Sequence, residues 1–155
     1  MLELRDVINE NMILLDLKIE KKEEVIEILV DLLGQNEKLT SKALFLKSVY
    51  DREELLSTYC GSDIAIPHGI SKAVKEPAVC FARTNEISWS GPEEKVHFVF
   101  LLAVPDSKND KDPQHLKLLS SIATLILEEQ VREIWERATN KKQILESLEL
   151  AVKNL

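Results

Sequence analysis

A histidine between a proline and a glycine is the strongest candidate for chemistry in this sequence. His68 follows the apolar residues 64–66 (IAI) and Pro67, and Gly69 comes directly after it. Proline fixes its own φ and favours an extended conformation in the residue before it, so we expect a short strand, then a turn that presents His68. An imidazole is nucleophilic at neutral pH without a general base, because its ordinary pKa is about 6.5. Gly69 has no Cβ, which would let a ligand or another backbone segment approach closely. The alternative is a turn histidine without a role.

Two other side chains are of types that could assist chemistry at His68. His115 lies in residues 112–116 (DPQHL), where we expect a helix to begin directly after a buried strand, and α/β folds bind anions at such places. Arg52 precedes the His68 segment, and a guanidinium is well suited to holding a phosphoryl group. Together the three would form a phosphohistidine site with a nucleophile, a hydrogen-bonding histidine and a stabilising positive charge. The alternatives are a surface histidine and a solvated arginine at a helix end.

Missing motifs argue against several other kinds of site. The sequence has no GxxxxGK[ST] loop and no GxGxxG, so a nucleotide is not an evident source of phosphate. A serine hydrolase is disfavoured because there is no GxSxG elbow, although serines flank His68. The three histidines share no metal-binding spacing and no cysteine joins them, so we expect no metal ion and no other cofactor. His97 lies inside a predicted strand, where a neutral, hydrogen-bonded structural side chain is the favoured interpretation.

Length, charge and cysteine content narrow the class of protein. A chain of 155 residues is most simply one domain, so we expect a single domain over residues 1–155. The net charge of −7, without a run of basic residues, argues against nucleic acid as a partner and against docking on an anionic membrane. The apolar runs are too short to cross a bilayer and the N-terminus is charged, so we expect no membrane insertion. Cys60 and Cys80 form no CxxC pair, which indicates reduced thiols and a cytoplasmic location.

The apolar pattern predicts helices on both sides of two strong strands. The apolar stripe of residues 25–33 predicts a helix from about Glu20 to Gly34, and Thr40 is the expected N-cap of a second helix that runs toward Arg52. The clearest strands are residues 78–83 and 96–104; shorter extended pieces are expected at 12–17, 55–60 and 64–66. Three helices should follow, the first with Asp112 as N-cap and Pro113 in its first turn, and the last with Asn140 as N-cap. Helices before and after a small hydrophobic sheet indicate an α/β sandwich.

In combination, these residues resemble a known family. The resemblance rests on motifs that occur in one order from about residue 5 to residue 148: Arg52-Glu53, Ser57-Thr58, Gly61, residues 64–69 (IAIPHG), Trp89, residues 96–105 and His115-Leu116. They resemble the IIA domain (EIIA type 2) of the fructose–mannitol class of the bacterial phosphoenolpyruvate-dependent sugar phosphotransferase system. The resemblance implies a three-layer α/β sandwich whose mixed central sheet has helices on both faces.

The resemblance also implies an activity, partners and residue roles. His68 would accept a phosphoryl group from the phosphohistidine of the carrier HPr and pass it to a cysteine of a IIB component for sugar uptake, and the IIB component would link the chain to the membrane IIC permease. His115 matches the family's second site histidine, Arg52 its site arginine and Thr58 the threonine near the site. Pro67 and Gly69 belong to the same motif as His68. Neither cysteine of this chain matches the IIB cysteine, so we expect a free-standing IIA protein or one excised from a longer chain.

Asp63 departs from the family pattern, which often has glycine at this position. Aspartate tolerates left-handed backbone better than most residues, so we expect the turn to survive. A carboxylate close to His68 would disfavour the dianionic phosphorylated product.

Two other functions stay open beside sugar transport. A regulatory IIA protein of the nitrogen-related branch would act by binding partner proteins according to its phosphorylation state. The residues Ile87-Ser88-Trp89 resemble the transport branch more closely. An interaction module that kept the fold and lost transfer is the third possibility, and the presence of both His68 and His115 argues against it.

Overall fold

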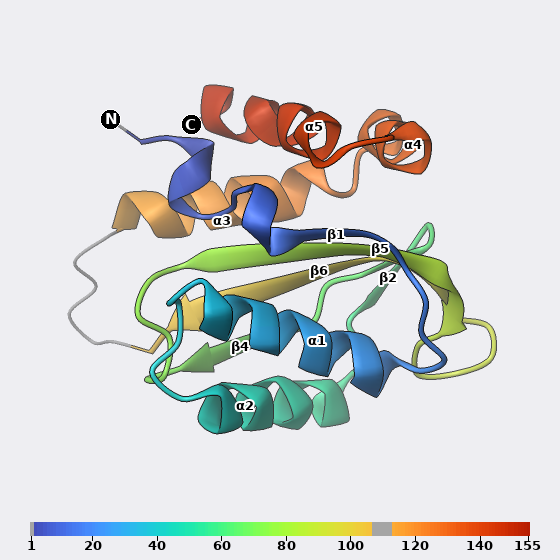
Figure 1. The fold of residues 1–155 in the computed structure, drawn as a ribbon, viewed down its shortest axis with the longest axis horizontal. Coiled ribbons are helices and arrows are strands. Elements are labelled where there is room, and N and C mark those ends of the chain that lie inside the picture. Colours follow the sequence, from blue (N-terminus) through green and yellow to red (C-terminus); the bar gives the residue numbers. More distant parts are fainter. Residues whose placement is uncertain (1, 107–112) are drawn as a thin grey trace.

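The computed structural model describes residues 2–106 and 113–155, and within them a mixed sheet lies between two layers of helices (Figure 1). Helices α1 (Lys22–Gln35) and α2 (Lys42–Leu55) cover one face of the sheet. Helices α3 (Pro113–Leu125), α4 (Glu129–Arg137) and α5 (Lys141–Lys153) cover the other, together with the 3-10 turns η1 (Leu4–Asp6) and η2 (Glu10–Met12). This arrangement confirms the predicted three-layer α/β sandwich.

The sheet is built around two long antiparallel strands, β5 (Ala78–Ser88) and β6 (Lys95–Pro105). The other strands in the described residues are β1 (Ile13–Leu17), β2 (Tyr59–Gly61), β3 (Ile64–Ala65) and β4 (His68–Ser71), and the order along the sheet is β1-β5-β6-β3-β2, with β4 paired to β6. Strand β1 is parallel to β5, whereas β3 and β4 are both parallel to β6. Phe81 and Phe100 pair across β5 and β6, and their ring centroids lie 5.9 Å and 4.9 Å from the ring of Trp135 in α4. These contacts hold the layer of α3, α4 and α5 on the sheet.

Strands β3 and β4 lie along the same edge of β6, and Pro67 separates them. The Leu102 N–H donates to the Pro67 carbonyl at 3.0 Å, and His68 then pairs in register with Leu102. The expectation that His68 lies on a turn is therefore wrong, because the chain resumes its pairing with β6 immediately after the proline and His68 is the first residue of a strand.

Several predicted boundaries also shift. Ser41, not Thr40, caps α2, because its hydroxyl accepts from the Leu44 N–H at 3.2 Å, while the Thr40 N–H bonds to Ala73. The extended piece expected at 55–60 is confirmed only at its end, since α2 continues to Leu55 and β2 begins at Tyr59.

Two elements end later than predicted, and the start of the last helix is as predicted. Helix α1 passes Gly34 and ends at Gln35, and β5 runs five residues beyond its predicted end at 83, to Ser88, through an irregularity between Arg83 and Ile87. Asn140 caps α5 as predicted, and Pro113 begins α3, whereas Asp112 lies outside the described residues.

Candidate functional site

The His68 ring is held by a backbone carbonyl. Its Nδ1 lies 3.0 Å from the Ile66 oxygen, and the side chain is half-buried at the start of β4. A carbonyl oxygen can only accept, so Nδ1 carries the hydrogen and Nε2 carries the lone pair. The nitrogen that remains for nucleophilic attack is therefore Nε2.

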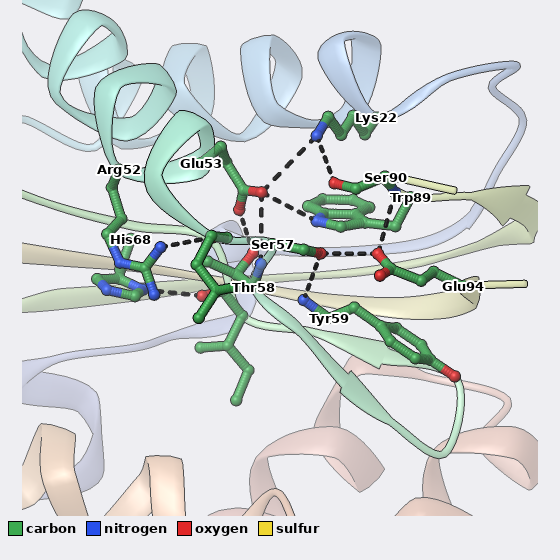
Figure 2. Close-up of polar contacts among 12 residues, drawn as sticks. Lys22, Arg52, Glu53, Ser57, Thr58, Tyr59, His68, Trp89, Ser90 and Glu94 are labelled. Atoms are coloured by element: carbon green, nitrogen blue, oxygen red, sulfur yellow. Dashed lines mark hydrogen bonds and ion pairs between the residues drawn. The ribbon is translucent and has the colours of Figure 1, made fainter. Parts of the chain in front are cut away.

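Arg52 comes from the last turn of α2, the helix that packs against β4. Its Nη1 donates to the Leu56 carbonyl at 2.6 Å. Figure 2 shows the Arg52 guanidinium and the His68 ring directed into the same region of the site. A fixed guanidinium at this place can meet the oxygens of a group that arrives at His68.

Thr58 is buried and acts on the site through the backbone. Its hydroxyl donates to Glu53 Oε1, and its carbonyl accepts from the Ile66 N–H at 3.0 Å. Thr58 thus supports the residue whose oxygen holds His68. Ser57, next to it, donates to Glu94 Oε1 at 2.7 Å (Figure 2).

Gly69 is required by helix packing and not by a ligand. A Cβ at this position would lie 2.3 Å from Ser48 Oγ and 3.1 Å from side-chain atoms of Phe45 and Val49, all on α2. The expectation that the missing side chain admits a ligand or another backbone is corrected accordingly: side chains of α2 fill that space.

His115 lies in the first turn of α3, in the helical layer opposite α2 (Figure 1). Its Nε2 is 3.3 Å from Asp6 Oδ2, and Asp6 belongs to η1. The Glu3 N–H and the His115 ring stabilise this carboxylate, and they hold the pKa of Asp6 below its usual value. Arg52, Thr58 and His68 are thus connected through the loop after α2, and the His115 ring lies against Asp6 of the N-terminal turn.

Asp63 takes the left-handed conformation, with φ of 68°, so the turn survives as expected. Its Oδ1 lies 3.7 Å from Nδ1 of His97, which is itself half-exposed. Both line a surface hollow with Asp16 and Arg83. The carboxylate of Asp63 therefore contacts His97 in this surface hollow.

Glu53 belongs to the site region, although the sequence motifs assigned it no role. It lies on the buried face of α2 with Phe45 and Val49, and it accepts from Trp89 Nε1 at 3.2 Å. The spacing of four residues between these three positions was the available signal, because it places a carboxylate in line with an apolar stripe. Asp6, the partner of His115, carries no comparable signal in the sequence.

Residues 6–150 match the protein-family model described as phosphoenolpyruvate-dependent sugar phosphotransferase system, EIIA 2. The chain belongs to this family. Within the described parts of this EIIA chain, no helix combines the length and the apolar character needed to cross a membrane. The same residues contain no cluster of three or more histidine, cysteine, aspartate or glutamate side chains arranged to hold a metal ion.

Similar proteins include both long and short members of the EIIA family. The 2-O-alpha-mannosyl-D-glycerate-specific EIIABC component of Escherichia coli is 32% identical over 96% of this chain, which spans only 23% of that protein. The fructose-specific EIIA component of Haloferax volcanii is 31% identical, with 82% of each chain covered. Among solved structures, the nitrogen regulatory protein IIA-Ntr of Neisseria meningitidis superimposes with a TM-score of 0.79 at 28% identity, covering 92% of this chain and 97% of that one.

Proposed function

We propose that this chain is a phosphocarrier of a sugar phosphotransferase system, in which His68 accepts a phosphoryl group from phospho-HPr and passes it to the cysteine of a IIB component. The observation that supports this proposal most directly is the bond between His68 Nδ1 and the Ile66 carbonyl, which leaves Nε2 as the nucleophile. Membership of the EIIA family of the phosphoenolpyruvate-dependent sugar phosphotransferase system supports a role in phosphoryl transfer.

The transfer needs one bond to form and one to break. His68 Nε2 attacks phosphorus in line with the donor nitrogen, the new P–N bond forms as the donor P–N bond breaks, and the donor imidazole recovers its lone pair. Positive charge that develops on the His68 ring is stabilised by the Ile66 carbonyl at Nδ1. Arg52 neutralises the equatorial oxygens, and we assign His115 a hydrogen bond to the same group.

The partners are expected to dock on the apolar surface beside His68. Leu55, Leu56 and Ile70 are exposed by 82%, 70% and 60%, and they lie at the end of α2 and on β4. A carrier must release each partner quickly, so we expect an interface below about 1,200 Å² in total. The E. coli relative is named an EIIABC component, which fits transfer of the phosphoryl group from a IIA part to a IIB part that works together with a IIC part.

The experiment that tests the proposal is incubation with phosphoenolpyruvate, Enzyme I and HPr, followed by measurement of the intact mass. We expect one acid-labile phosphoryl adduct on the native chain, none on His68→Ala, and a slower but detectable adduct on His115→Ala. Absence of the adduct from the native chain would contradict the proposal.

The second candidate is the regulatory role, which the similarity to IIA-Ntr favours. The two roles differ in the fate of the phosphoryl group. A phosphocarrier should lose the adduct within seconds to minutes when a IIB protein with its active-site cysteine is added. A regulatory protein should keep the adduct under the same conditions.

A further inference from the structure

A buried carboxylate lies at the centre of the network in Figure 2, and the transfer steps leave it without a role. Glu53 is 8% exposed. Its oxygens accept from Thr58 Oγ1, from Thr58 N at 3.4 Å and from Trp89 Nε1 at 3.2 Å, and Lys22 Nζ lies 3.8 Å away. A charge is costly to bury unless it is paired and hydrogen-bonded, and this one has both kinds of partner.

The partners of Glu53 come from three different parts of the chain. Lys22 begins α1 and also donates to Ser90 Oγ at 2.8 Å, while Trp89 follows β5 and is 4% exposed. Thr58 is in the loop between α2 and β2. Glu53 therefore links this loop to the start of α1 and to the buried Trp89.

A continuous path of hydrogen bonds leads from Glu53 to the nucleophile. Glu53 holds Thr58, the Thr58 carbonyl accepts from the Ile66 N–H at 3.0 Å, and the Ile66 carbonyl accepts from His68 Nδ1 at 3.0 Å. A displacement of Thr58 would move the carbonyl that decides which nitrogen of His68 carries the hydrogen.

A second branch leads to the site arginine. Arg52 Nη1 donates to the Leu56 carbonyl at 2.6 Å, two residues before Thr58. If the loop is released at Thr58, the acceptor that orients the guanidinium is released with it.

We propose that Glu53 is a positioning residue of the transfer reaction. By holding Thr58, it fixes both the Ile66 carbonyl that sets the tautomer of His68 and the loop carbonyl that receives the arginine. The kinetic consequence rests on the proposed phosphocarrier function, whereas the consequence for the His68 ring does not.

The test is Glu53→Gln, which keeps the shape of the side chain but presents an N–H₂ group to partners that are themselves donors. At alkaline pH, ¹⁵N spectra of the imidazole should show His68 as the Nδ1–H tautomer in the native chain and as a mixture of tautomers in the variant. The rate of transfer from phospho-HPr should fall about 10- to 100-fold, because small misplacements of reacting groups have effects of this size. The KM for phospho-HPr should stay nearly unchanged, since the docking surface is intact.

Ser147→Ala is the matched control. Ser147 Oγ accepts from the Trp135 indole at 2.8 Å in a buried pair between α4 and α5, so this variant also deprives a buried tryptophan of its acceptor. It should lower the melting temperature without changing the His68 tautomer or the transfer rate. If Ser147→Ala changes both as much as Glu53→Gln does, the effect is one of general stability and the proposal is wrong.

A second pair of variants decides the matter if Glu53→Gln does not fold. Thr58→Val removes the hydroxyl and keeps the branched shape, whereas Thr58→Ser keeps the hydroxyl. We expect Thr58→Val to lose the tautomer preference and the rate, and Thr58→Ser to retain both. Native behaviour of Thr58→Val, or of a folded Glu53→Gln, overturns the proposal. A native chain that accepts no phosphoryl group overturns the phosphocarrier function instead, and the tautomer spectra still decide the role of Glu53.

Discussion

The imidazole of His68 keeps the same hydrogen bond before and after phosphorylation under the proposed mechanism. Nδ1 donates to the Ile66 carbonyl in the free protein, and a phosphoryl group on Nε2 leaves that hydrogen in place. The ring therefore needs no rotation between the two states. This pre-organisation lowers the barrier by avoiding a reorientation during transfer.

Tyr50 offers a test of the electrostatics on α2. Burial, followed by the neighbouring Glu27 carboxylate, raises the pKa of Tyr50 to about 12. In a Tyr59→Phe chain, where Tyr50 is the remaining tyrosine, the absorbance titration near 295 nm should have its midpoint at that pH. Added Glu27→Gln should lower the midpoint but leave it above the ordinary value of about 10, because burial is the larger cause.

The same pKa shift predicts how stability depends on alkaline pH. The folded state binds the Tyr50 proton more tightly than the unfolded state does. Its contribution is fully present below about pH 10 and is lost as the pH rises toward 12. A titration midpoint at the ordinary value would contradict the burial of this phenol.

The residues of the site were predictable to different degrees, for physical reasons. His68 could be recognised because it directly follows a proline that restricts the backbone and lies in the motif of residues 64–69. Glu53 was harder to recognise, because two of the residues that hold its carboxylate, Lys22 and Trp89, are distant in the sequence. The partner of His115 depends on where η1 packs, and local sequence does not determine that.

At the scale of elements, the contact between α2 and β4 can be tested at Gly69. Gly69→Ala should destabilise the protein by about 1–3 kcal/mol, because the new Cβ would lie 2.3 Å from Ser48 Oγ and close to Phe45 and Val49. Urea unfolding measures the loss. Gly69→Ala combined with Ser48→Ala should recover part of it, since the nearest atom is then absent. A single variant as stable as the native chain would show that α2 can move away at little cost.

Three successive residues at the end of β2 and in the turn to β3 have positive φ: Gly61 at 82°, Ser62 at 52° and Asp63 at 68°. Asp63→Ala should therefore cost about 1 kcal/mol in thermal or urea unfolding, because alanine lacks the local hydrogen bonding that lets aspartate occupy this region. Asp63→Gly should stay close to the native stability, since relief of the backbone cost is offset by the greater entropy of the unfolded chain. Equal stability of the two variants would argue against a left-handed Asp63.

The helices, the two long strands and the extended pieces that form β1 and β3 were predictable, but β4 and the partners of the short strands were not. The helices have apolar stripes of the right period, and β5 and β6 are rich in β-branched and aromatic residues. Strands β3 and β4 have two and four residues, which is too few for periodicity to indicate a partner. Their place beside β6 follows from the long-range packing of the sheet.

At the scale of the whole molecule, the reactivity of the two thiols tests whether the core excludes solvent. Cys60 is exposed, whereas Cys80 lies buried in β5, where burial raises the pKa of its thiol far above the ordinary range. A thiol reagent at pH 8 should modify one cysteine in the native protein and two in denaturant, because the thiolate is the reactive form. Mass mapping should place the native adduct on Cys60, and fast modification of Cys80 would contradict the packing of the sheet.

The edge position of β4 affects which part of the protein unfolds locally. Strands β5 and β6 pair along eight positions, and only six residues connect them. Strand β4 pairs with β6 along four positions, and each pair joins residues more than thirty positions apart in the sequence. Segments of this kind detach at a lower free energy than the global unfolding of the domain. In native-state hydrogen exchange, the amides of residues 68–71 should therefore lose protection well before those of residues 79–82. The strand that carries His68 would then open by itself, while the central hairpin of the sheet keeps the rest of the protein folded.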